Sequence, residues 1–292
     1  MYELIQAGEN TYYIQCPAKI GIWRANETGV YLIDSGNDKD AGRKALKILN
    51  ENGWRLLGIL NTHSNADHVG GNRYLQNQTG CPIFAGGAEA AIIRHTVLEP
   101  ALVYGGFPFR DLHHKFLMAQ ASDARYMDDP AFPSEIEIIP LPGHFIDMAG
   151  FRTPDDVVFL ADCVMGAGTL EKYGVTFLFD IGAQLETLET VARMQAALFI
   201  PSHADATDNV RPLVRANRAK ILEIADKLLD LCAPPMTFED VLQKIFTHYH
   251  LTMSAAQYVL VGSTVRSYLA WLKDTGRLTV SYLDNRMLWQ RK

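Results

Sequence analysis

The sequence of 292 residues predicts a mixed α/β (α+β) fold. Short apolar runs typical of buried strands alternate with amphipathic stretches typical of helices, first over residues 11–85 and again over residues 135–203. Several of these runs end in a single His or Asp. Because chemistry is often carried where strands end on a rigid scaffold, we expect these residues to meet at one face. The chain has no repeat at solenoid period and no low-complexity tract.

The first predicted elements are three strands and a helix. The strands are Thr11–Gln15, Ile20–Ala25 and Gly29–Asp34. Asp38–Asn52 is predicted to be an amphipathic helix, because apolar residues recur on one side and Gly53 follows its end. A buried strand at Leu56–Leu60 comes next, and a polar loop and a helix separate it from a short strand at Pro82–Ala85.

The loop at residues 62–71 concentrates donors of the kind that bind metal ions. It carries His63, Asp67 and His68. In a loop between a strand and a helix these groups can converge on one point, and zinc and similar cations prefer such nitrogen and oxygen donors. A polar loop with solvated histidines is the alternative, which this stretch alone does not exclude.

Four further donors follow apolar runs. Gly143 leads into His144, and two later runs end at Asp162 and His203. Near the start of the chain, Val30–Ile33 ends at Asp34. One polar residue after a strand is ordinary. Four of them beside a histidine-rich loop indicate strand ends that share one site.

Taken in order, these motifs resemble the metallo-β-lactamase superfamily. The resemblance runs from the N-terminus to about residue 205. It implies a four-layer αββα sandwich with one or two metal ions at the edge of the sheets. Zinc is the expected metal, with iron and manganese as alternatives.

The same resemblance implies a ligand set. His63 and His144 would help to bind the first metal ion. The second would be held by Asp67, His68 and His203, and Asp162 would bridge the two.

The chain departs from the family signature His-x-His-x-Asp-His at Asn65, which replaces the second histidine. An amide oxygen is a neutral and weaker donor than an imidazole, so the site for the first metal ion loses one nitrogen ligand. The site for the second metal ion keeps all of its expected ligands. The departure also supports the alternative that the protein binds metal without catalysing hydrolysis.

The expected mechanism uses water activated by metal, with Asp67 and Asp34 as the candidate catalytic residues. Asp34 would accept a hydrogen bond from a ligand's free N–H, or it is only a strand cap. The leading function is hydrolysis of a small ester, lactone or thioester. A phosphodiesterase or ribonuclease of the same fold is the alternative.

Composition favours a small-molecule substrate. A net charge of −6 and a pI near 5.8 argue against a nucleic-acid or anionic membrane partner. No apolar run approaches the ~20 residues that cross a bilayer. The start has no signal-peptide pattern, and the four cysteines form no CxxC pair, so we expect a cytoplasmic protein with reduced thiols.

Residues 1–205 are predicted to form the catalytic domain, interrupted by an insertion at 86–134. Its aromatic residues, among them Tyr104 and Phe107, lie beside paired glycines. This composition suits a lid over the active site or an interface in a homodimer, and the sequence leaves both open.

The end of the chain predicts a separate module. Residues 206–235 form a long connecting helix that is broken by Pro234 and Pro235. Residues 236–292 give two helices and a β-hairpin that resemble a winged helix. The longer helix is mostly apolar near Ala255–Val261, so structural support or closure of a pocket is favoured over DNA binding.

Overall fold

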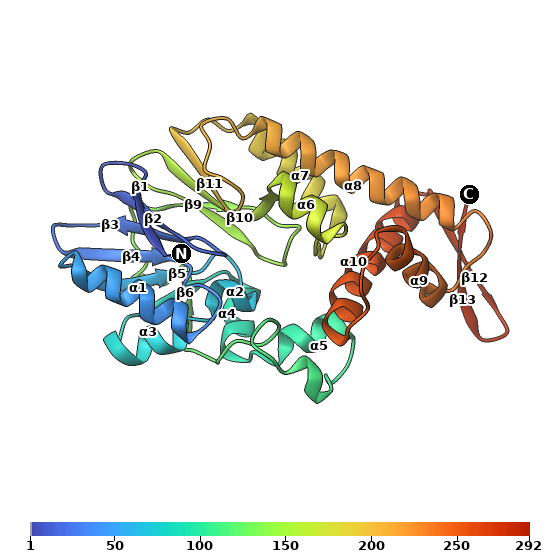
Figure 1. Cartoon of the computed structure of the whole chain (residues 1–292), viewed down its shortest axis with the longest axis horizontal. Helices are drawn as coiled ribbons and strands as arrows, with labels where there is room; N and C mark the ends of the chain where they lie inside the picture. The colour runs from blue at the N-terminus through green and yellow to red at the C-terminus, as the bar shows by residue number, and fades with distance from the viewer. Residues whose placement is uncertain (1) are drawn as a thin grey trace.

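The computed structural model describes residues 2–292, which fold around two facing β-sheets (Figure 1). The first sheet has seven strands in sequence order: β1 Glu3–Gln6, β2 Thr11–Gln15, β3 Ile20–Arg24, β4 Gly29–Ile33, β5 Arg55–Leu60, β6 Ile83–Ala85 and β7 Ala124–Tyr126. Pairing is antiparallel from β1 to β4 and parallel from β4 to β7. The carboxyl ends of β4 and β5 therefore share one edge, and Asp34 and the loop at 62–71 follow them directly.

The second sheet has four strands in the order β11-β10-β9-β8. Their bounds are β8 Glu137–Pro140, β9 Ala149–Arg152, β10 Val157–Met165 and β11 Leu198–His203. Every residue of β10 is buried, because it has a neighbour on each side and layers on both faces. β10 and β11 run parallel, so Asp162 and His203 lie toward the same end of this sheet.

Helices cover the outer faces of both sheets (Figure 1). Those between the strands of the first sheet are α1 Lys39–Glu51, α2 Ala66–Val69, α3 Asn72–Thr79, α4 Gly87–Arg94, α5 Leu98–Tyr104 and the 3₁₀ helix η1 Arg110–Leu112. The later helices are α6 Ala167–Tyr173, α7 Ile181–Arg193, α8 Arg211–Leu231, α9 Phe238–His248 and α10 Ala255–Asp274. A hairpin of β12 Leu278–Leu283 and β13 Arg286–Arg291 ends the chain. The predicted αββα sandwich is thus confirmed.

The two sheets pack against each other through one apolar cluster. It contains Trp23 and Phe84 from the first sheet and Phe151 and Phe159 from the second. Gly21 makes room for this contact, since a Cβ there would lie 2.5 Å from the Phe159 ring. This close approach holds the two loop-bearing edges at a fixed separation.

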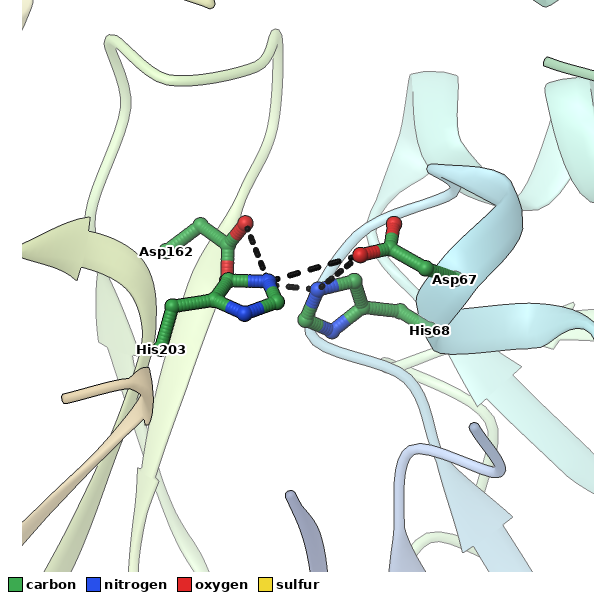
Figure 2. Close-up of side chains that lie close together, drawn as sticks. All are labelled: Asp67, His68, Asp162 and His203. Carbon is green, nitrogen blue, oxygen red and sulfur yellow. Dashed lines mark ion pairs between the residues drawn. The ribbon is translucent and has the colours of Figure 1, made fainter. Parts of the chain in front are cut away.

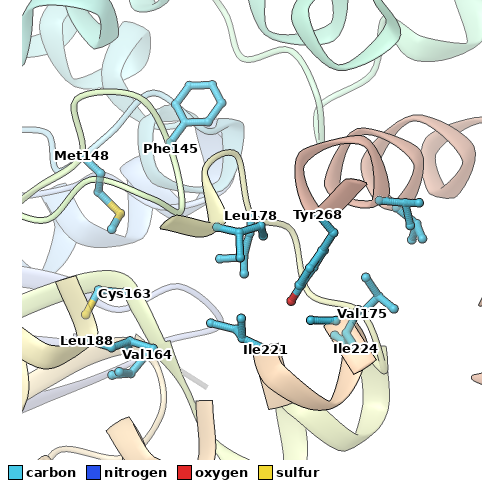
Figure 3. Close-up of a cluster of buried hydrophobic side chains, with 14 of the residues drawn as sticks. Phe145, Met148, Cys163, Val164, Val175, Leu178, Leu188, Ile221, Ile224 and Tyr268 are labelled. Carbon is cyan, nitrogen blue, oxygen red and sulfur yellow. The ribbon is translucent and has the colours of Figure 1, made fainter. Parts of the chain in front are cut away.

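A larger cluster joins the second sheet to the C-terminal helices. It includes Val164 on β10, Ile221 on α8 and Tyr268 on α10 (Figure 3). Tyr268 is fully buried. Because these elements share one core, α10 is anchored to the sandwich and lies beside the edge that carries Asp162.

The sequence located most elements and missed three strands. Helix α1 begins at Lys39 rather than at the predicted Asp38, because Asp38 is its N-cap and its side chain accepts a hydrogen bond from the Ala41 N–H at 2.9 Å. Strands β1, β7 and β9 were not predicted, and β8, β9 and β10 follow one another without the helices expected between strands there. β7 pairs in parallel with β6 inside the segment that was expected to be an insertion.

Within residues 2–292, no helix combines the length and apolar character that a bilayer crossing requires.

Candidate metal centre

Four side chains from three elements, α2, β10 and β11, converge where the two sheets meet (Figure 2). The His203 Nε2 lies 3.4 Å from an Asp67 oxygen and 3.3 Å from an Asp162 oxygen. The His68 Nε2 lies 3.2 Å from the other Asp162 oxygen. Each group offers one donor atom, and all four donors lie within 4.8 Å of one another.

The donors expected for the first metal ion lie beside these four side chains and share Asp162 with them. Donor atoms of His63, His144 and Asp162 also lie within 4.8 Å of one another. The Asn65 Oδ1 is 3.1 Å from the His144 Nε2, so the amide faces the group of His63 and His144. The structure therefore brings every sequence-predicted ligand together as two neighbouring clusters with a common carboxylate.

Asp34 lies behind both clusters and orients their histidines. Its carboxylate accepts hydrogen bonds from the Thr62 N–H, the Thr62 hydroxyl and the His68 Nδ1–H, each at 2.8 Å. The Thr62 hydroxyl gives its one proton to Asp34, so it accepts from the His63 Nδ1–H at 2.9 Å. Both imidazoles consequently present Nε2 to the clusters. The alternative that Asp34 only caps a strand does not fit these contacts.

Electrostatics divide the histidines into two kinds. Burial lowers the pKa of His63 well below its usual value and also lowers that of His144. Both stay neutral, which is the form that binds metal. Burial also opposes charge on His203, but Asp162 and Asp67 outweigh it and raise the pKa of His203 to about 10. Burial raises the pKa of Asp67, whereas His68 and His203 act against this and lower it to about 2.

Unpaired buried atoms test whether a metal ion fits here. The His63 Nε2 is buried without a hydrogen-bond partner, and the buried His68 Nε2 and Asp162 Oδ1, 3.2 Å apart, have no partner except each other. Such atoms are rare in folded proteins, because burial without a partner costs free energy. All three face the clusters. Their imidazole and carboxylate chemistry suits a divalent transition metal, so the residues present fit two ions.

Backbone constraints fix His144 in place. The preceding Gly143 has φ +128°, a conformation that residues with a side chain rarely adopt. A Cβ there would lie 2.4 Å from the backbone of Gln184 at the start of α7. Only glycine lets the loop pass this close to the helix, and this contact sets where the His144 ring lies.

Sequence reasoning missed two buried side chains that hold the ligand loops. Glu89 on α4 accepts hydrogen bonds from the Ser64 N–H at 2.9 Å and the Asp147 N–H at 2.8 Å, and so joins the loops of His63 and His144. Lys19 donates to the backbone carbonyls of Pro201 and Ala204, on either side of His203. Burial lowers the pKa of Lys19. Neither residue belongs to a motif, so composition carried no signal for them.

A cavity of about 610 Å³ opens directly on the clusters. Asp67, Asp162, His144 and His203 form part of its lining. Its other walls come from α6, α10 and the segment at 86–134, through Lys172, Leu260 and Phe116 among others. Tyr104 and Phe107, the expected lid aromatics, do not line it. Their rings pack on Phe109 and His113 instead, and Phe107 is 81% exposed.

Known proteins resemble this chain in sequence and in fold. A hydroxyacylglutathione hydrolase of Methylococcus capsulatus is 32% identical over 126 residues, which is 42% of this chain and 40% of that protein. The chain spans about half the length of the curated relatives it matches. A β-lactamase domain protein from Burkholderia ambifaria aligns over 99% of this chain and 94% of its own, with TM-score 0.72 and 17% identity. A metallo-β-lactamase family protein from Thermus thermophilus aligns over 97% of this chain and 99% of its own, with TM-score 0.71 and 17% identity.

The two solved structures share the fold over nearly the whole chain, including its C-terminal helices. The model of the metallo-beta-lactamase superfamily matches residues 9–203, the part that contains both sheets and both donor clusters. The chain belongs to the metallo-β-lactamase superfamily.

Proposed function

We propose that this protein is a metal-dependent hydrolase of a small thioester, with esters and lactones as related substrates. The observation that carries the proposal is the pair of donor clusters at the floor of the 610 Å³ cavity. His63, Asn65 and His144 would hold one ion, and Asp67, His68 and His203 the other, with Asp162 between them. When bound, such ions lower the pKa of a water molecule toward neutrality and polarise the attacked carbonyl group. Zinc is the first choice, and iron or manganese are alternatives.

Asp67 is the ligand best placed to act on that water. Its side chain is 38% exposed and lines the cavity, whereas Asp162 is 6% exposed. With its pKa lowered to about 2, the Asp67 carboxylate stays ionised at neutral pH. It therefore acts as a hydrogen-bond acceptor that orients the water rather than as a store for its proton. Asp34 acts through His68, so we assign it a positioning role.

Thioesters fit the site for a chemical reason and are also suggested by relatives. A thiolate leaves without first taking a proton, so no acid beside the leaving group is needed. The curated relatives are named hydroxyacylglutathione hydrolases, and that name describes a thioester substrate. The cavity lining is largely apolar and includes Phe116, Phe177 and Leu260, which suits the acyl or thiol part of a small molecule.

A polynucleotide substrate is disfavoured by charge. Lys172 is the one Lys or Arg among the described residues that line the cavity. A phosphodiester backbone requires several cations along its path. The net charge of −6 also opposes binding.

We further propose that residues 1–205 form the catalytic domain and that residues 236–292, joined by the helix at 206–235, form a winged-helix-like module which closes the cavity. Val103, Leu112 and Leu117 of the segment at 86–134 pack against Val259 of α10. This contact supports a wall or lid built from both parts, rather than an exposed dimer interface.

Loss of single ligands tests the metal assignment. Asp67→Ala and His203→Ala should each reduce bound metal by about one ion per chain, because each removes one of few donors. Metal content is measured by plasma emission spectrometry on protein purified with zinc, with the exposed His248→Ala as the matched control. Wild-type metal content in both ligand variants would contradict the assignment.

A substrate panel tests the reaction class. Protein loaded in turn with zinc, manganese and iron(II) is assayed with thioester, ester, lactone and phosphodiester substrates. We expect thioesters to give the highest kcat/KM. Turnover of phosphodiesters alone would favour the nuclease alternative. Full metal loading without hydrolysis of any substrate would favour the non-hydrolytic one.

Two exposed aromatic residues of one segment test the cavity wall. Phe116→Ala should raise KM about 3- to 10-fold with little change in kcat, because Phe116 lines the cavity and loses apolar contact with substrate. Phe107→Ala is the control, since Phe107 is exposed and lies outside the lining. Both melting temperatures should stay near that of the wild type. Equal KM values in the two variants would place the substrate elsewhere.

A further inference from the structure

The Asn65 amide contacts two different partners, one on each side. Its Nδ2 donates a hydrogen bond to the Glu99 Oε1 at 2.9 Å, and its Oδ1 lies 3.1 Å from the His144 Nε2. Glu99 lies on α5, 34 residues further along the chain, and is 4% exposed. We propose that Glu99 is a positioning residue that fixes the Asn65 amide with its oxygen toward the first metal ion. This inference rests on the proposed function, because it assumes an ion at that position.

An amide needs such a partner where an imidazole would not. Rotation of the Asn65 side-chain amide by half a turn exchanges its oxygen and its NH₂ group. The NH₂ group carries two protons and cannot bind a cation. Asn65 makes no capping hydrogen bond to α2, so its own helix does not choose the orientation. The Glu99 Oε1 accepts a hydrogen bond from the Asn65 NH₂ group and so fixes the orientation of the amide, with its oxygen toward His144.

No cation partner explains the burial of Glu99, whose contacts are the Asn65 amide and the Ala66 N–H at the start of α2. Among the ion pairs of residues 2–292, none involves Glu99. A buried carboxyl group without a cation partner is costly to desolvate. Burial also raises the pKa of Glu99 well above its usual value. In either protonation state the group can keep one oxygen free to accept from Asn65, so the positioning role does not require charge.

A second buried carboxyl group in the same segment provides a matched comparison. Glu89 accepts hydrogen bonds from the Ser64 hydroxyl at 2.6 Å, the Ser64 N–H and the Asp147 N–H. It touches no group that faces the donor clusters. Glu89 therefore supports the loops, whereas Glu99 contacts a candidate ligand directly. Changes at Glu89 report the general cost of disturbing a buried acid here.

Calorimetric titration of chelator-stripped protein with zinc and with manganese tests the inference. Glu99→Met keeps the length of the side chain and removes the acceptor, so the weaker of two metal Kd values should rise about 10- to 100-fold. The tighter Kd should change less than about threefold, because Glu99 does not touch the second set of ligands. Glu99→Gln keeps an acceptor oxygen and should stay within about threefold of wild type at both positions. Glu89→Gln measures how far weaker support of the His63 and His144 loops lowers metal affinity, and the loss in Glu99→Met at the weaker ion should exceed it.

Two outcomes would overturn the positioning role. The first is a Glu99→Met protein that titrates like wild type. The second is Glu99→Gln that binds the weaker ion as poorly as Glu99→Met, since the acceptor would then not be what matters. The melting temperature of each stripped variant separates loss of the fold from loss of a ligand. If Glu99→Met does not fold, Glu99→Ala takes its place as the variant without an acceptor, with the same expected loss at the weaker ion.

A double-substitution cycle shows whether Glu99 acts through Asn65. In an Asn65→Ala background, Glu99→Met should weaken the first ion no further. An additional loss there would assign Glu99 a separate effect and overturn the inference. If wild-type protein and Glu99→Met both take up two ions with the same Kd values, the positioning role is rejected and the proposed function stands. Wild-type protein that takes up none rejects both this inference and the proposed function.

Discussion

The buried carboxylate of Asp34 is the group on which the geometry of the site depends. It is 2% exposed, sits at the end of β4 with φ +64°, and accepts hydrogen bonds from both Thr62 and His68. Through the Thr62 hydroxyl it also fixes His63. Leaving a buried donor without its acceptor costs about 1–3 kcal/mol of free energy. The loop therefore favours the one conformation in which all of these hydrogen bonds form. In that conformation two Nε2 atoms face the clusters, which is the orientation that the proposed metal ions need.

The sandwich and the rest of the chain contribute different parts of the site. The two sheets bring the donors together through strand ends, and their separation is set by contacts such as Gly21 against Phe159. Residues 168–177, on α6 and in the loop after it, provide the largest share of the cavity wall, and Phe116 and Leu260 add contacts from the segment at 86–134 and from α10. The donor atoms and much of the wall thus come from different elements, so the wall can vary while the donor clusters stay the same.

The sequence predicted those parts of the structure that follow local rules. Donors such as His144 and His203 follow apolar runs, and the ends of neighbouring strands share an edge of the sheet. Their convergence could therefore be inferred from the sequence alone. Strand β7 could not be found this way, because it has three residues and two of them are exposed. Glu99 and Glu89 escaped notice for a related reason. Each is a single acid on a short helix, and only the packing of that helix against the metal loop reveals what it contacts. Hydrophobicity does not tell which aromatic ring faces a cavity, so the sequence could not distinguish Phe116 from Tyr104 and Phe107.

The central claim is that the chain binds two metal ions unequally, because an amide oxygen stands where an imidazole would give a stronger donor. Calorimetric titration of stripped wild type and Asn65→His with zinc tests this most directly. We predict two ions for each protein, a tighter and a weaker one in the wild type, and at least about a tenfold lower Kd for the weaker ion in Asn65→His. Identical stoichiometry and identical Kd values in the two proteins would show that Asn65 does not contact a metal ion and would contradict the account.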